Sequence, residues 1–251
     1  MPIPRPIAVQ LYTLRDRLAD DFEGTIREVA RLGYDGVEPF TMPGVSAHEQ
    51  AEVIRRHGLQ VPSAHLPLPT GADREATIEA ARALGVKTVV SGLGPESFQD
   101  HQATTRSIGQ FNEAAAAARE AGFGFAIHNH WWEFEGQPPA WRRMLEELHP
   151  DIGFEIDTYW VAAAGTDPVS VLRELGERVG LVHMKDGSAR RGDPMTALGQ
   201  GSLDIGAIAA AAEHARWLIV ELDECATDML TAVADSLAFL RGVESERVAD
   251  L

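Results

Sequence analysis

One pattern recurs along this chain and limits what it can fold into. An amphipathic stretch ends at a glycine, and a short run rich in apolar and β-branched residues follows it. Glycine adopts the left-handed backbone conformation that often ends a helix, so each stretch is predicted to be a helix and each run a buried strand. The clear copies place helix, glycine and strand at 25–32, Gly33 and 36–40; at 47–57, Gly58 and 59–65; at 74–84, Gly85 and 86–91; and at 99–121, Gly122 and 123–128.

The rest of the chain continues the alternation less regularly. Further helices are expected near 139–148, 168–175, 205–214 and 228–241, and further strands at 6–10, 154–157, 179–183 and 217–221. Strands that alternate with helices at this spacing form parallel βαβ units, and eight of them match a single α/β domain over residues 1–251, a (β/α)8 TIM barrel. The alternative is an open doubly wound sheet. The strand count and the lack of a Gly-x-Gly-x-x-Gly motif after the first strand disfavour it.

Charge and cysteine content restrict the partners and the compartment. The 251 residues include 22 Lys and Arg against 38 Asp and Glu, a formal net charge of −16. This balance predicts no nucleic-acid or membrane partner, because phosphate groups are bound by clustered basic residues. A single cysteine, Cys225, allows neither an intramolecular disulfide nor a zinc site built from cysteines. We therefore expect a cytoplasmic protein without a leader or membrane span, and a homodimer stays open.

Polar side chains gather where the predicted strands end. Functional residues of a parallel barrel lie at the carboxyl ends of the strands and in the loops that follow. The residues at these ends are Gln10, Tyr12, Glu38, His65, Ser91, His128, His130, Glu133, Asp157, His183, Lys185, Glu221 and Asp223. Each one alone is typical of a solvated strand end or a helix cap, so only their common location indicates a site.

Residue types at the last four strand ends indicate a metal. Strands five to eight supply a carboxylate, a carboxylate, a histidine and a carboxylate, which could converge on one divalent cation. Such ligands suit Mn²⁺, Mg²⁺ or Co²⁺ better than a metal that prefers thiolates, and Zn²⁺ stays compatible. Strand alternation also places Glu155 on the same face as Asp157, one layer deeper. A buried carboxylate needs a partner, so Glu155 either has one or lies outside the interior.

Several segments resemble the sugar phosphate isomerase/epimerase superfamily, the xylose isomerase-like barrels that include ketose epimerases and inosose dehydratases. The segments are VQLYTLR at 9–15, GYDGVE at 33–38, SAH at 63–65, NHWWEF at 129–134, FEIDT at 154–158, LVHMKD at 181–186, LGQGSLD at 198–204 and VELD at 220–223. Their order and spacing cover nearly the whole chain.

The resemblance implies one divalent metal held by Glu133, Asp157, His183 and Glu221. The first of these departs from the ketose 3-epimerase pattern, in which a Glu stands at the end of strand five. This chain has His128 there, and Glu133 lies five residues later. Either Glu133 reaches back to the metal or a histidine supplies the fourth ligand.

The resemblance also implies an enzyme, a metal-dependent sugar isomerase or epimerase. The metal would stabilise the enediolate of a small keto-sugar or hydroxy-ketone, Glu221 would transfer a proton on one face, and Glu133 or His128 would act on the other. A lyase that dehydrates a keto-inositol or 3-keto-sugar is the alternative, and a non-catalytic partner subunit is a further one. A DNA-repair enzyme like endonuclease IV is disfavoured by the acidic composition.

Further side chains are candidates for substrate binding. They are His65, His130, Lys185, Trp131 and Trp160. Lys185 is in phase with His183 and could bind an oxyanion, or it could simply pair with an acid. The tryptophan faces could cover a sugar ring, although ordinary packing explains them equally well.

Overall fold

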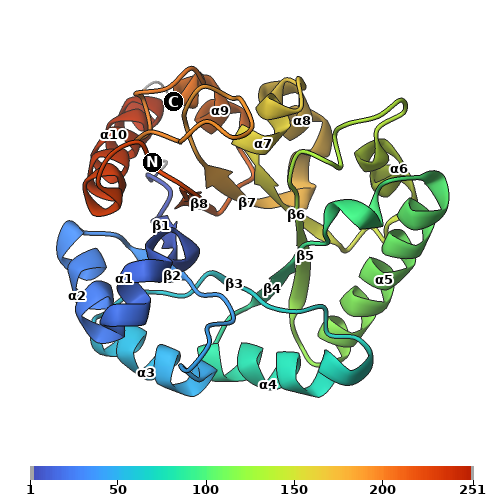
Figure 1. The fold of residues 1–251 in the computed structure, drawn as a ribbon, viewed down its shortest axis with the longest axis horizontal. Coiled ribbons are helices and arrows are strands. Elements are labelled where there is room, and N and C mark those ends of the chain that lie inside the picture. Colours follow the sequence, from blue (N-terminus) through green and yellow to red (C-terminus); the bar gives the residue numbers. More distant parts are fainter. Residues whose placement is uncertain (1–2, 250–251) are drawn as a thin grey trace.

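Eight parallel strands form the core of the molecule (Figure 1). The structure is a computed structural model, and it describes residues 3–249. The strands are β1 (Ile7–Gln10), β2 (Gly36–Glu38), β3 (Ser63–His65), β4 (Thr88–Ser91), β5 (Gly124–His128), β6 (Gly153–Asp157), β7 (Val179–Met184) and β8 (Trp217–Val220). They lie in the order β2-β1-β8-β7-β6-β5-β4-β3, so the first strand pairs with the last. The parallel bridges Gly36↔Gln60 and Phe40↔His65 nearly close the barrel between β2 and β3. The predicted (β/α)8 barrel is therefore confirmed.

Helices surround the strands on the outside (Figure 1). They are α1 (Arg15–Asp20), α2 (Phe22–Leu32), α3 (Ala47–Arg56), α4 (Arg74–Leu84), α5 (His101–Glu120), α6 (Ala140–Glu147), α7 (Thr158–Ala163), α8 (Pro168–Leu175), α9 (Ile205–Ala211) and α10 (Met229–Ala249). The α2 helix shows how the sequence sets these bounds. The Asp21 carboxylate accepts a hydrogen bond from the backbone N–H of Gly24 at its start, and Gly33 ends it with φ of 97°.

Several elements differ from their sequence-based expectations, among them the following. The third strand was expected over 59–65 but covers only Ser63–His65, because Pro62 has no N–H to pair. The last helix continues to Ala249 instead of ending near Arg241. A short helix, α7, starts directly after β6, where Asp157 caps its first turn through the backbone N–H of Trp160.

The inner face of the barrel is apolar at the bottom and polar at the top. Ala8, Ala126, Leu181 and Ile219 form part of a small buried cluster inside the barrel. Side chains two residues apart on a strand point to the same face. The residues that follow them on this face are Gln10, His128, His183 and Glu221, and the pairing of Leu181 with His183 and of Ile219 with Glu221 is the one expected from the sequence.

Among the described residues, no helix is both long enough and apolar enough to cross a membrane. The outer faces of the strands pack against the helices in one large hydrophobic core. It contains residues such as Val9, Phe111, Ile156 and Leu237.

Candidate metal centre

Four side chains from strand ends β5 to β8 converge at the top of the barrel. The ligand atoms of His128, Asp157, His183 and Glu221 all lie within 4.8 Å of one another, and we call these residues the rim group. His183 Nδ1 is 2.6 Å from Glu221 Oε2, and His128 Nε2 is 4.0 Å from Asp157 Oδ2. All four residues are buried. Two carboxylates and two imidazoles are a donor set that fits a divalent cation such as Mn²⁺, Co²⁺ or Zn²⁺.

A buried ammonium group borders the rim group. Lys185 is 1% exposed, and its Nζ lies 2.9 Å from Asp157 Oδ2 and 2.8 Å from both Glu221 Oε2 and Asp223 Oδ2. Burial alone would lower the pKa of Lys185, but these three carboxylates outweigh it and hold the pKa well above its usual range. The lysine is therefore a fixed positive charge within the site.

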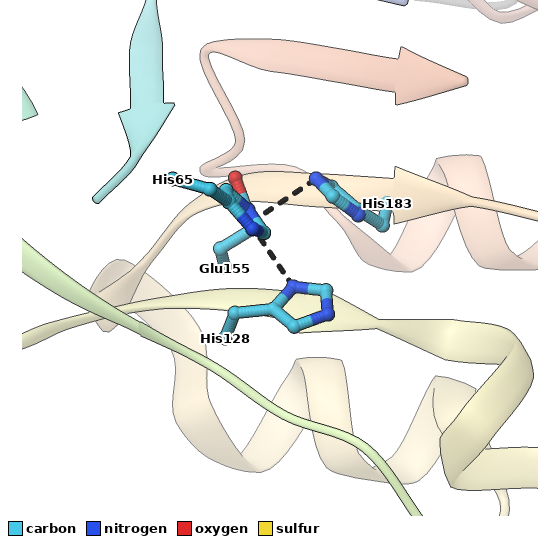
Figure 2. Close-up of side chains that lie close together, drawn as sticks. All are labelled: His65, His128, Glu155 and His183. Carbon is cyan, nitrogen blue, oxygen red and sulfur yellow. Dashed lines mark hydrogen bonds and ion pairs between the residues drawn. The ribbon is translucent and has the colours of Figure 1, made fainter. Parts of the chain in front are cut away.

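A second group of side chains lies one layer deeper. Glu155 points inward, and the rings of His65, His128 and His183 converge on its carboxylate (Figure 2). Glu155 Oε2 is 2.6 Å from His65 Nε2, 3.0 Å from His128 Nδ1 and 3.1 Å from His183 Nε2. The sequence left open whether Glu155 has a partner, and these imidazoles are its partners.

Glu38 is the other deep carboxylate, and it belongs to the same layer. Its Oε2 lies 2.8 Å from His183 Nε2 and accepts a hydrogen bond of 2.9 Å from the Gln10 side chain, and the Ser63 hydroxyl donates to Oε1. The sequence placed Glu38 at a strand end but assigned it no role. Its partner on the seventh strand is 145 residues away in the chain, so no local pattern could have revealed the contact.

Burial shifts the titration of several of these groups. Burial raises the pKa of Asp157 to about 6, although Lys185 opposes the shift. Burial lowers the pKa of His128 to about 3, so this imidazole is neutral near pH 7. For Glu221, burial favours the neutral form, but Lys185 and His183 outweigh it and hold the pKa well below the usual range.

Glu133 is buried but is not a member of the rim group. Its Oε2 accepts a hydrogen bond from the backbone N–H of His130, and its buried Oε1 has no hydrogen-bond partner. Burial raises the pKa of Glu133 to about 8. The two groups of candidate ligands in the described residues include His128 and not Glu133.

The other substrate-binding candidates divide between two places. His65, His130 and Lys185 line a cavity of about 590 Å³ at the carboxyl ends of the strands, which also exposes His128 and Glu221. Tyr12, Phe40 and Trp132 add aromatic faces to its wall. Trp131 and Trp160 instead pack against each other, with ring centroids 4.7 Å apart, outside that lining.

Another cavity, of about 350 Å³, lies at the opposite end of the barrel. Its lining includes Gly124, Gly153 and Arg216, which lie at or near the amino-terminal ends of strands. Neither candidate ligand group of the described residues borders it. The rim cavity is therefore where the possible chemistry lies.

Comparisons with known proteins identify other proteins that share this fold. An uncharacterized protein from Mycobacterium leprae is 25% identical in an alignment that covers 92% of this chain and 94% of that protein. A sugar phosphate isomerase/epimerase from Parabacteroides distasonis superposes with a TM-score of 0.79 at 21% identity, covering 95% of this chain and 94% of its own.

Two further solved structures share the fold. An L-ribulose 3-epimerase has a TM-score of 0.75 at 21% identity and covers 99% of this chain and 97% of its own. The IOLI protein, solved with a zinc atom, has a TM-score of 0.75 at 15% identity, with 96% and 98% covered. The sequence profile of the family described as xylose isomerase-like TIM barrel matches residues 26–243. The chain therefore belongs to the xylose isomerase-like TIM barrel family.

Proposed function

We propose that this protein is a divalent-metal-dependent isomerase or epimerase of a small keto-sugar or hydroxy-ketone. The observation that carries the proposal is the convergence of the rim group beside a cavity large enough for a sugar. The names of the similar structures, which include an L-ribulose 3-epimerase and a protein with bound zinc, support it. When bound, the cation would supply Lewis-acid stabilisation of the enediolate that forms as the α-proton leaves.

We further propose that His128, Asp157, His183 and Glu221 hold the cation. His128 stands at the end of β5, level with Glu155 on β6, and its Nε2 faces Asp157. Glu133 is bound to the His130 backbone instead. With His128 as the strand-five ligand, the ligating group is a neutral imidazole. It can donate its lone pair to the cation without first losing a proton.

Proton transfer is assigned to Glu221 and its neighbours. Glu221 reaches the cavity wall, and its low pKa keeps it ionised, as a group that accepts a proton must be. Lys185 lies 2.8 Å from it and can stabilise negative charge that develops on a substrate oxygen. His130 also lines the cavity, where its ring could contact a bound substrate.

The wall chemistry favours a neutral carbohydrate as substrate. Among the described residues that line the cavity, Lys185 is the only Lys or Arg, and three carboxylates already surround it. A phosphate group would find few additional donors there. The faces of Tyr12, Phe40 and Trp132 can instead cover the apolar side of a sugar ring.

Solvent isotope exchange tests the proposed reaction. The protein, loaded with Mn²⁺, is incubated in D₂O with free ketohexoses, ketopentoses and inososes, and products are read by NMR. We expect deuterium at the α-carbon and an epimer or isomer without loss of water. A dehydrated product would instead support the alternative, a lyase on a keto-inositol or 3-keto-sugar. A protein that exchanges no α-proton in any of these compounds would contradict both functions.

A further inference from the structure

We propose that the two deep carboxylates set opposite tautomers in the two histidines of the rim group. Glu155 fixes His128 with its proton on Nδ1, and Glu38 fixes His183 with its proton on Nε2. This inference rests on the proposed metal site, because it explains how both imidazoles present a lone pair to the same point. Glu38 and Glu155 are positioning residues, since each acts through a histidine.

The two nitrogens of His128 face different layers. Nδ1 lies 3.0 Å from Glu155 Oε2 below, and Nε2 faces Asp157 Oδ2 at 4.0 Å above. An ionised carboxylate can only accept hydrogen bonds, and a neutral imidazole has one N–H and one lone pair. The proton of His128 therefore belongs on Nδ1, which leaves the Nε2 lone pair directed toward the rim.

His183 has the reverse arrangement. Its Nε2 lies 2.8 Å from Glu38 Oε2, and its Nδ1 lies 2.6 Å from Glu221 Oε2. The N–H at Nε2 donates its hydrogen bond to Glu38. Nδ1 is therefore the nitrogen that can donate a lone pair at the rim when a cation is present. Opposite tautomers thus follow from the opposite orientation of the two rings relative to the deep layer.

The deep carboxylates are themselves held in place. Glu38 is 0% exposed and accepts hydrogen bonds from Gln10 and Ser63. Glu155 is also 0% exposed, and His65 Nε2 lies 2.6 Å from its Oε2. Burying a carboxylate without hydrogen-bond donors costs free energy. Rotation of either side chain away from its histidine is therefore unfavourable. Carboxylates that accept from a metal-bound histidine typically affect metal affinity by roughly 10–100-fold.

Histidine tautomers can be read directly by long-range ¹H–¹⁵N NMR on the Zn²⁺-loaded protein. In the unchanged protein, we expect a protonated Nδ1 for His128 and a protonated Nε2 for His183. Glu155→Gln should change the pattern of His128 more than that of His183, because His183 Nε2 keeps Glu38 Oε2 at 2.8 Å when it loses Glu155 Oε2 at 3.1 Å. Glu38→Gln should change the pattern of His183 and leave that of His128 as it was. Each variant should also bind Zn²⁺ roughly 10–100-fold more weakly in competition with a chelator.

The outcomes separate this inference from the proposed function. If one equivalent of Zn²⁺ binds at the rim but both histidines carry the proton on the same nitrogen, the tautomer assignment is wrong and the metal site stands. If His65 and Glu155 bind Zn²⁺ themselves, the deep layer is a ligand set and the assignment is also overturned. If no Zn²⁺ binds to the unchanged protein, the proposed metal site is wrong. The tautomer assignment, which rests on that site, is then wrong as well. The tautomers of the unchanged protein decide the matter even if a variant does not fold.

Discussion

At the scale of single residues, strand alternation explains how the site is assembled. Ala126 and His128 point to the same side of β5, as do Leu181 and His183 on β7, so each histidine stands above an apolar floor. Each buried side chain of the rim group and of the deep layer contacts residues on other strands. Removing one of these side chains therefore disturbs contacts on several strands. Substitutions at the rim and in the deep layer should therefore lower both metal affinity and the stability of the fold.

The identity of the strand-five ligand gives the first prediction. His128→Ala should weaken Zn²⁺ binding by at least roughly tenfold, because it removes one of four proposed ligands. Glu133→Gln should keep the affinity within a few fold, since Glu133 is bonded to the backbone N–H of His130. Isothermal titration calorimetry of both variants measures this directly. Loss of binding in Glu133→Gln alone would restore Glu133 as the ligand.

Glu221→Gln should abolish turnover while the fold stays intact. The amide cannot accept the α-proton, and the general base typically contributes roughly 10²–10⁴-fold to a rate. The D₂O exchange assay measures the rate, and circular dichroism measures the fold. Turnover close to that of the unchanged protein would remove Glu221 from the mechanism.

The sequence predicts some of these residues well and others not at all. Asp157, His183 and Glu221 end runs of apolar residues, so their location at the rim could be expected. The contacts of Glu38 with His183 and of His65 with Glu155 depend on the stagger between distant strands, which no local pattern records. Whether Glu133 or His128 is the strand-five ligand depends on the path of the loop after β5, which the sequence also leaves open.

At the scale of elements, the loop after β7 is organised by one carboxylate. Asp186 is fully buried, and it accepts hydrogen bonds from the backbone N–H groups of Gly187, Gly199, Gly201 and Leu203. The segment from 187 to 204 thus folds back onto the residue that follows Lys185. This places the loop beside the rim without a helix or strand of its own.

Asp186→Ala should destabilise the protein by about 1–3 kcal/mol, because it leaves the N–H groups of buried Gly187 and half-buried Leu203 without an acceptor. Asp186→Asn should cost less, since its side-chain oxygen keeps part of the acceptor capacity. Urea denaturation followed by fluorescence gives both values. Equal stability of Asp186→Ala and the unchanged protein would show that water replaces the carboxylate.

The bounds of helices and strands follow the sequence where local signals are strong. The glycines that end helices were expected, and Gly33 and Gly85 are left-handed as predicted. The α7 helix was not expected, because its six residues are too few to show a periodic pattern. Its cap is Asp157, so one carboxylate starts a helix through Oδ1 and faces the rim through Oδ2.

At the scale of the whole molecule, Arg5, just before β1, is fixed to the last helix. Arg5 forms an ion pair with Glu244 of α10 and donates hydrogen bonds to the backbone carbonyls of Ala209 and Ala212 near α9. The Glu244 side chain is 1% exposed and also accepts from Arg247. These contacts join the residues before β1 to the final helices, beside the place where β1 pairs with β8 (Figure 1).

This ion pair predicts a loss of stability in acid. Burial raises the pKa of Glu244, but the hydrogen bonds from Arg5 and Arg247 outweigh it and lower the pKa to about 2. The usual value is 4.5, so the stabilisation is complete above about pH 5 and is lost as the pH falls toward 2. The linked free energy is on the order of 3 kcal/mol.

Glu244→Gln should remove this part of the acid dependence. Urea denaturation between pH 6 and pH 3 compares the variant with the unchanged protein, and the difference in stability between them should shrink as the pH falls. A constant difference over that range would show that Glu244 has no lowered pKa.

Location of a bound cation tests the central claim most directly. Crystals of the protein grown with Zn²⁺ or Mn²⁺ give an anomalous difference map that shows where the ion lies. We predict one peak, bonded to His128, Asp157, His183 and Glu221, with His65 and Glu155 left as hydrogen-bond partners below it. A map without a peak at the rim, or with its peak between His65 and Glu155, would contradict the account.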